Sequence, residues 1–230
     1  MNRKDDHPMI RGALFDMDGV LFDTETLGME LMPKAAEAFG QTMDKALYHK
    51  LLGVNEHLSR QIIADAYGPD FPFDDFHNQF LAYFLDIAKA GQLPRKPGLT
   101  ECMQGLKARG IKIALATSTQ RPVVECYLNN TSELRDVFDA TVCGIEVPNG
   151  KPAPDIYLEA ARQLGLTPEE CVGIEDSRNG LRSLRGAGVH SVMIPDLLPF
   201  SDELAPYVDT CLTSLHELCP LIDRLNWWKN

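Results

Sequence analysis

The sequence contains six cysteines among its 230 residues but no C-x-x-C pair. This scatter indicates neither a zinc cluster nor a disulfide framework. Several of the cysteines lie within apolar runs, as expected for buried reduced thiols. No apolar run approaches the length of a membrane span, and the polar first eight residues lack the apolar stretch of a signal peptide. We therefore expect a cytoplasmic protein.

Positive charge is also scarce. Lysine and arginine number 22 against 33 aspartates and glutamates, which gives a net charge of −11. No basic stripe offsets this excess, so we expect neither a nucleic acid nor a membrane surface as partner. The chain has no glycine-rich phosphate loop with a following lysine, which excludes kinases built on that loop. A small phosphorylated molecule remains compatible with an acidic surface where a metal and one lysine supply local positive charge.

Short apolar runs recur along the chain, and each ends in a glycine, a proline, a hydroxyl residue or an acidic residue. They cover residues 9–15, 111–116, 139–143, 171–174 and 191–194. Stretches with helical start and stop signals lie between the later runs, at 98–109, 154–164 and 179–187. Strands that alternate with helices predict a parallel sheet wrapped by helices. The expected fold class is α/β, with a doubly wound, Rossmann-like core.

The stretch from residue 24 to about residue 92 breaks this alternation, because it offers helical periodicity and no convincing strand. Apolar residues four apart from Leu27 to Phe39 share one face, although Pro33 should kink or split that helix. Three more helices are expected at 46–52, 58–67 and 73–90. The prediction is a small all-helical cap over residues 23–94, inserted after the first strand of a core formed by residues 1–22 and 95–230.

Asp16 and Asp18 stand where the first apolar run ends, and Gly19 marks the turn that stops it. Two crowded carboxyls repel each other, so a fold gains little by keeping them there. A bound cation would remove that repulsion and leave one carboxylate as a nucleophile and the other able to hold a proton. The alternative is an ordinary Asp-Gly turn with a capping carboxylate. The motif alone does not decide between the two.

Further polar residues follow other predicted strands. They are Thr117, Ser118, Lys151, Glu175 and Asp176. Each has a simpler explanation: a turn cap, a solvated surface lysine, or the start of the next helix. In an open parallel sheet, however, ligands bind beyond the carboxyl ends of the strands. The ordered appearance of all these residues at strand ends favours one shared functional site.

This ordered set resembles the four motifs of the haloacid dehalogenase-like hydrolase superfamily. The motifs are Asp16-Met17-Asp18-Gly19-Val20, Thr117-Ser118, Lys151-Pro152 and Glu175-Asp176. The helical insert resembles the small cap of the branch that includes β-phosphoglucomutase and many sugar-phosphate phosphatases. The resemblance extends from about Ile10 to Leu212. It implies Mg²⁺-dependent phosphoryl transfer through an aspartyl-phosphate.

The resemblance also implies a role for each acidic residue. Asp16 is the expected nucleophile. The expected metal ligands are the Asp16 carboxylate, the Asp18 backbone carbonyl and Asp176, with Glu175 as a further ligand or beside the ligands. Mg²⁺ prefers such oxygen donors and keeps several waters. The Asp18 side chain is then free to protonate the leaving alkoxide and later to deprotonate the attacking water.

The remaining motif residues are expected to bind phosphate. Lys151 would neutralise charge on Asp16 and on the transferring group. The Thr117 hydroxyl and the Ser118 amide would hold phosphoryl oxygens. Together with Asp16 and Asp18, Thr117 and Lys151 form the expected catalytic set.

The substrate is a weaker inference. Related β-phosphoglucomutases carry a cap arginine just after a Gly-Val pair, whereas here Gly53-Val54 is followed by Asn55-Glu56, with Arg60 one turn further on. The lysine-asparagine pair that follows the second motif in those relatives is replaced by Gln120-Arg121. We therefore expect a phosphatase acting on a small phosphorylated metabolite, with a phosphosugar mutase as the alternative. A non-catalytic binding module is disfavoured because every motif residue is present, and a monomer is expected.

Overall fold

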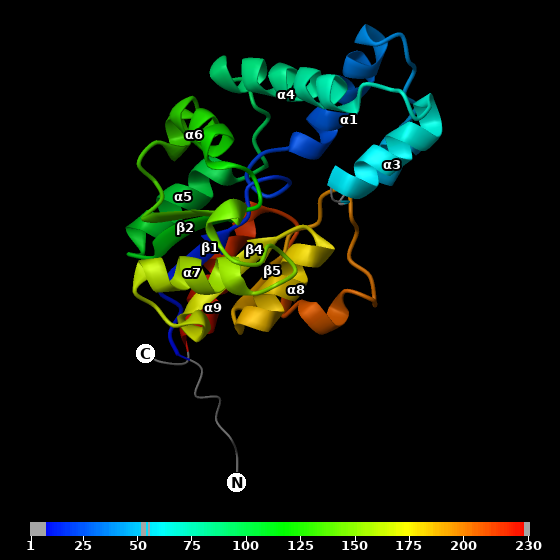
Figure 1. The fold of residues 1–230 in the computed structure, drawn as a ribbon. Coiled ribbons are helices and arrows are strands. Elements are labelled where there is room, and N and C mark those ends of the chain that lie inside the picture. Colours follow the sequence, from blue (N-terminus) through cyan, green and yellow to red (C-terminus); the bar gives the residue numbers. More distant parts are fainter. Residues whose placement is uncertain (1–7, 52–53, 55, 228–230) are drawn as a thin grey trace. The chain divides into compact units, whose positions relative to one another are not determined.

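The computed structural model describes residues 8–51, 54 and 56–227 (Figure 1). It divides into two compact units. The first combines Met1–Asp23 with Pro94–Asn230, and the second is Thr24–Leu93.

The first unit is built on a six-stranded sheet in the order β3-β2-β1-β4-β5-β6, and all of its neighbouring strands are parallel. The strands are β1 (Gly12–Phe15), β2 (Lys112–Thr117), β3 (Ala140–Cys143), β4 (Cys171–Glu175), β5 (His190–Met193) and β6 (Thr210–Cys211). Phe15 pairs with Leu115 on one side and with Ile174 on the other, so β1 lies at the centre. The predicted α/β class is confirmed.

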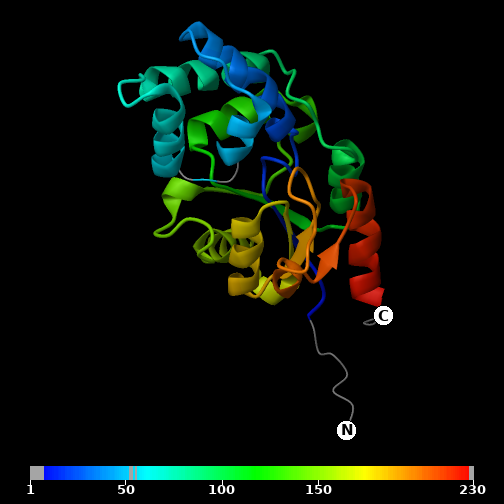
Figure 2. The same ribbon diagram turned by 90° about the vertical axis from the view of Figure 1, so that its right-hand side faces the viewer.

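Helices cover both faces of this sheet. They are α5 (Leu99–Ala108), α6 (Arg121–Asn129), α7 (Asp155–Leu164), α8 (Arg178–Ala187) and α9 (Leu218–Trp227). In Figure 2, α9 (red) lies on one side of the strands and α8 (yellow to orange) lies on the other. Helix α7 packs beside α8, and α5 packs beside α9, so the unit has three layers. Short 3₁₀ turns complete it at Ser132–Leu134, Gly144–Glu146, Pro168–Glu170, Ala205–Tyr207 and Leu215–Glu217.

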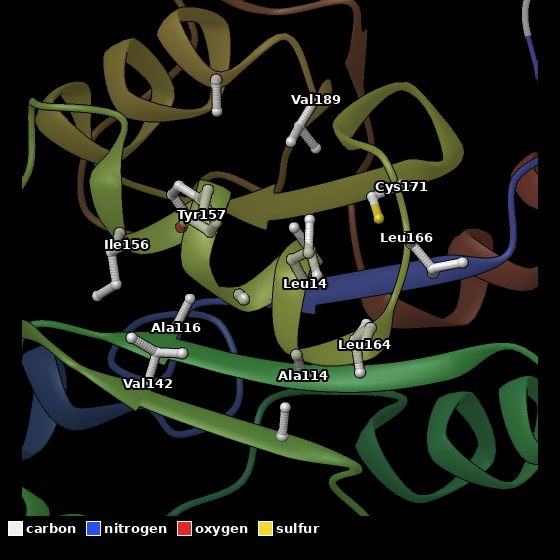
Figure 3. Close-up of a cluster of buried hydrophobic side chains, with 14 of the residues drawn as sticks. Leu14, Ala114, Ala116, Val142, Ile156, Tyr157, Leu164, Leu166, Cys171 and Val189 are labelled. Carbon is white, nitrogen blue, oxygen red and sulfur yellow. The ribbon is translucent and has the colours of Figure 1, made fainter. Parts of the chain in front are cut away.

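Strand β1 is apolar along its whole length because both of its faces are covered. On the α7 and α8 side, Leu14 joins a cluster with Ala114, Val142 and residues of α7 (Figure 3). Tyr157 of α7 is part of this cluster and is fully buried. The packing fixes the ends of β1, β2 and β4 relative to one another.

The second unit contains only helices among its described residues: α1 (Thr24–Ala38), α2 (Lys45–Leu51), α3 (Glu56–Tyr67) and α4 (Phe73–Lys89). An aromatic cluster that includes Tyr48, Phe73 and Phe76 holds them together. Of the two expected effects of Pro33, a kink or a split, the split is wrong, because α1 continues through the proline. The proline removes one backbone hydrogen bond, but Leu27, Leu31, Ala35 and Ala36 are buried along the helix. Such burial, rather than each backbone bond, supplies most of a helix's stability.

Two helices and one strand of the first unit were not foreseen from the sequence: α6, α9 and β6. Strand β6 has only two residues. Helix α9 is tied to the start of the chain by Asn226, whose side chain accepts from the Ile10 amide at 2.7 Å and donates to the Ile10 carbonyl at 3.0 Å. Across the described part of the chain, no helix has the length and apolar character needed to cross a membrane.

Candidate active site

Three neighbouring strands deliver polar side chains to one edge of the sheet. Asp16 directly follows β1, Thr117 is the last residue of β2, and Glu175 is the last residue of β4. The Asp16 amide donates to the Ile174 carbonyl at 3.0 Å, which extends the β1–β4 pairing to Asp16 itself. Since β1 and β4 are parallel neighbours, their carboxyl ends bring Asp16 and Glu175 together.

The turn after β1 places backbone beside Asp176. Gly19 has a φ of +77°, a conformation that side chains disfavour. The Asp176 carboxylate lies where a Cβ on Gly19 would stand. The Gly19 amide donates to the Phe22 carbonyl at 2.9 Å, which closes the turn. Glycine is therefore required here for two reasons, and its absent side chain allows the Asp16–Gly19 loop to approach Asp176.

Lys151 reaches this edge from the loop between β3 and α7, where the Lys151–Pro152 peptide is cis. Its Nζ donates to Asp16 Oδ1 at 2.6 Å and to Glu175 Oε1 at 2.7 Å. The Lys151 side chain is 6% exposed, and the Glu175 side chain is fully buried. The ammonium thus bridges two buried carboxylates that come from different strands.

Glu175 is held by several further donors. Its Oε1 accepts the Tyr157 hydroxyl at 2.7 Å. Its Oε2 accepts the Asp176 amide, the Ser177 amide and the Ser177 hydroxyl at 3.2, 3.1 and 3.0 Å. A Cβ at Gly180, in the first turn of α8, would overlap this carboxylate. The orientation of Glu175 is therefore fixed from all sides by neighbouring elements.

The cluster buries more negative than positive charge, and burial together with the neighbouring charges shifts the pKa values of its members. Burial raises the pKa of the Asp16 carboxyl to about 7, against the lowering effect of Lys151 and with a further rise from Glu175. Burial lowers the pKa of Lys151, but the negative charges of Asp16 and Glu175 outweigh it and raise the pKa above its ordinary range. Burial also raises the pKa of Tyr157, so its hydroxyl is a proton donor.

The donor set fits a hard divalent cation. Asp16, Glu175 and Asp176 are all buried, and one carboxylate oxygen from each lies within 4.8 Å of the others. Carboxylate oxygens are the donors that Mg²⁺ and similar ions prefer. A cation among them would offset both the burial and the neighbouring negative charges that raise the pKa of Asp16. These residues can therefore hold a metal ion.

Asp18 makes a contact on the β2 side of the site. The Thr119 hydroxyl donates to Asp18 Oδ2 at 2.7 Å, and the Thr119 amide donates to Thr117 Oγ1 at 3.1 Å. Thr117 is buried, whereas Ser118 is exposed. The loop after β2 also packs closely on Gly144, since a Cβ there would lie 3.2 Å from Ser118 Cα. The second predicted motif thus meets the first through Thr119.

The structure brings four of the residues selected from the sequence into direct or near contact: Asp16, Lys151, Glu175 and Asp176. Thr117 ends the adjoining strand β2, and Asp18 and Ser118 lie on the loops after β1 and β2. Sequence reasoning missed Thr119 and Tyr157. Thr119 stood beside the second motif, and its hydroxyl was the available signal. Tyr157 offered only a hydroxyl on an otherwise apolar helix face. A buried tyrosine hydroxyl generally needs a hydrogen-bond partner, but the sequence does not indicate which residue that partner is.

Comparisons with known proteins identify the family of this chain. The family model of the haloacid dehalogenase-like hydrolases matches residues 10–188. The phosphorylated carbohydrates phosphatase of Thermotoga maritima is 34% identical over 188 residues, which cover 80% of this chain and 84% of that protein. The protein CbbY of Cereibacter sphaeroides is 34% identical over 218 residues, which cover 91% and 94%.

A solved structure has the same fold. It is a mutant of CbbY from Rhodobacter sphaeroides in complex with xylulose-1,5-bisphosphate. It superimposes with a TM-score of 0.75 at 32% identity and covers 91% of this chain and 96% of its own. The chain therefore belongs to the haloacid dehalogenase-like hydrolase family, and it is a phosphatase of that family.

Proposed function

We propose that this phosphatase hydrolyses small phosphorylated carbohydrates or similar metabolites with Mg²⁺ bound, through an aspartyl-phosphate on Asp16. The observation that carries the proposal is the Lys151 ammonium at 2.6 Å from Asp16 Oδ1, beside the buried carboxylates of Glu175 and Asp176. An anionic nucleophile meets an anionic phosphate only where positive charge is concentrated. Lys151 provides part of that charge.

In the first half-reaction, an Asp16 oxygen attacks phosphorus, and the bond from phosphorus to the leaving oxygen breaks. The Asp18 carboxyl donates its proton to that oxygen, which leaves as an alcohol. In the second half-reaction, water attacks the phosphorus of the aspartyl-phosphate and gives a proton to Asp18. Inorganic phosphate leaves and Asp16 is restored.

The proposed metal ligands are the Asp16 and Asp176 carboxylates and the Asp18 backbone carbonyl. When bound, Mg²⁺ would supply positive charge to the phosphoryl oxygens. The Thr117 hydroxyl and the Ser118 amide are proposed to hold two of those oxygens. Lys151 keeps its charge at neutral pH, because the neighbouring carboxylates raise its pKa.

The two compact units suggest a division of labour. We assign catalysis to the first unit, which contains every residue of the proposed mechanism. We assign the choice of leaving group to the second unit, as the cap. The carbohydrate substrate class is supported by the names of the relatives, a phosphorylated carbohydrates phosphatase and a protein solved with a sugar bisphosphate.

Arg60 supports a hydrolase over a phosphosugar mutase. Its guanidinium donates to Asp74 at 2.7 Å and lies 4.4 Å from the centre of the Phe73 ring. These contacts within the second unit give Arg60 a structural role. Gly53 and Asn55, where the mutase comparison begins, lie outside the described residues. Arg121, in the other replaced pair, binds Glu146 and the Thr141 carbonyl.

The test is a panel of phosphomonoesters ranked by kcat/KM, with Mg²⁺ and with a chelator. Metal-dependent phosphate release, fastest with sugar phosphates, is expected. Release from no ester would contradict the proposal. Incubation with β-glucose 1-phosphate and a trace of the bisphosphate separates the two activities: a phosphatase yields free phosphate, whereas a mutase accumulates glucose 6-phosphate.

A further inference from the structure

Tyr157 has no role in the proposed mechanism, yet its hydroxyl contacts the charged side chains of the site. The hydroxyl donates to Glu175 Oε1 at 2.7 Å. The same oxygen accepts Lys151 Nζ at 2.7 Å. Tyr157 and Lys151 therefore share one acceptor atom. A change at either donor alters how strongly Glu175 Oε1 attracts the other donor.

The position of this hydroxyl is fixed by packing. The ring of Tyr157 lies among the apolar side chains between α7 and the sheet, and the residue is fully buried (Figure 3). Lys151 Nζ lies 5.0 Å from the centre of the same ring, so the ring also contacts the ammonium. A packed aromatic ring leaves its hydroxyl little freedom. The donor therefore acts at a defined place.

Lys151 lies between two competing carboxylates. Asp16 Oδ1 and Glu175 Oε1 accept from the ammonium at 2.6 and 2.7 Å. The other oxygen of Glu175 is already bonded to donors of Asp176 and Ser177. The ammonium and the hydroxyl therefore meet at Oε1. The Tyr157 hydroxyl thereby occupies part of the accepting capacity of that oxygen.

We propose that Tyr157 is a positioning residue, whose hydroxyl acts through Glu175 to keep the Lys151 ammonium on Asp16. Without the hydroxyl, Glu175 Oε1 attracts Lys151 more strongly. The ammonium then shifts away from Asp16 Oδ1, and less of its charge acts on the nucleophilic carboxylate and on the transferring group. This inference rests on the proposed function, since it assigns Tyr157 to the same site.

The variant Tyr157→Phe tests this, because it removes one oxygen and keeps the ring in the cluster. We expect kcat to fall roughly ten-fold and KM to stay within about two-fold of the wild type, since the interaction is needed in the transition state. The matched control is Tyr48→Phe, which also removes a buried hydroxyl, here one that donates to the Glu25 carbonyl at 2.9 Å. Its kcat is expected to match the wild type.

A second background tests the route through Glu175. In Glu175→Gln, the charged acceptor is gone, so removing the hydroxyl as well should lower kcat by less than about two-fold. If removing the hydroxyl lowers kcat as much in Glu175→Gln as in the wild type, Tyr157 does not act through Glu175. A Tyr157→Phe kcat within two-fold of the wild type would also overturn the proposal, as would a fall in melting temperature well beyond that of Tyr48→Phe, which would indicate a structural role.

The outcomes separate this inference from the proposed function. If the wild-type protein releases phosphate and Tyr157→Phe is equally active, only the role of Tyr157 is overturned. A wild-type protein that releases no phosphate from any ester overturns the proposed function itself.

Discussion

Lys151 Nζ lies 2.6 Å from Asp16 Oδ1, although the two residues are 135 positions apart in the sequence. They meet because β1 is central in a parallel sheet and the loop before α7 returns to the same edge. Both side chains are nearly buried, at 6% and 11% exposed. Each charge therefore depends strongly on the other.

Replacing Lys151 by methionine should affect both activity and stability. We expect kcat/KM to fall about 100- to 1000-fold, as when a preorganised group that stabilises transition-state charge is lost. Stability should fall by about 3 kcal/mol at neutral pH, because buried carboxylates lose their counter-charge. Urea unfolding and phosphate release measure the two effects. Lys107→Met is the control, since Lys107 is exposed and donates to the Asp136 carbonyl. Equal behaviour of the two variants would contradict the account.

Metal binding should distinguish the two neighbouring acids after β4. Glu175 accepts from Lys151, Tyr157 and Ser177, so we expect Glu175→Gln to keep Mg²⁺ affinity within about three-fold. Asp176→Asn should weaken that affinity at least about ten-fold, because it loses a proposed ligand charge. Calorimetric titration of each protein with MgCl₂ gives the comparison directly. The reverse order of affinities would make Glu175 the ligand instead.

Thr119 should matter to catalysis through its hydroxyl. It donates to Asp18 Oδ2 at 2.7 Å, and Asp18 is the proposed acid and base. Thr119→Val is expected to lower kcat roughly five- to ten-fold, since the carboxyl loses a partner that orients it. Thr119→Ser retains the donor and should recover most of the rate. If Thr119→Val and Thr119→Ser have the same kcat, the Thr119 hydroxyl does not orient Asp18.

Asn226 tests a purely structural contact. Its side chain exchanges two hydrogen bonds with Ile10 and ties α9 to the residues before β1. Asn226→Ala should lower the free energy of unfolding by about 1–3 kcal/mol, because a partly buried backbone donor and acceptor lose their partners. Chemical denaturation measures this, and kcat should not change. A large fall in kcat at unchanged stability would show that the contact influences the site.

The sequence predicted the sheet and most of the residues at its edge for a physical reason. Buried parallel strands are short apolar runs, and Asp16, Thr117 and Glu175 each stand where such a run ends. Strand order was not needed to infer a shared site, because parallel strands end at the same edge. The resemblance to a known family then supplied the roles.

Other features depend on three-dimensional packing that no local pattern encodes. Tyr157 reaches Glu175 only because α7 packs against β1, β2 and β3. The number of residues between Lys151 and Tyr157 is not a pattern that would have indicated this contact. Helix α1 continues through Pro33 because its buried face outweighs the lost hydrogen bond. Strand β6 has two residues, too few for a pattern. Substrate choice has no motif at all, since a fold leaves specificity open.

The most direct test of the central claim is whether Asp16 carries the phosphoryl group. Wild-type protein and Asp16→Asn are each mixed with Mg²⁺ and an aryl phosphate whose phosphoryl group is labelled, and the reaction is quenched in acid within the first turnover. The protein is then assayed for bound label. Circular dichroism is the control for folding. We predict acid-stable, hydroxylamine-sensitive label on the wild type, as expected for an acyl phosphate. Asp16→Asn should remain folded, carry no label and release no phosphate. Undiminished phosphate release by folded Asp16→Asn would contradict the mechanism.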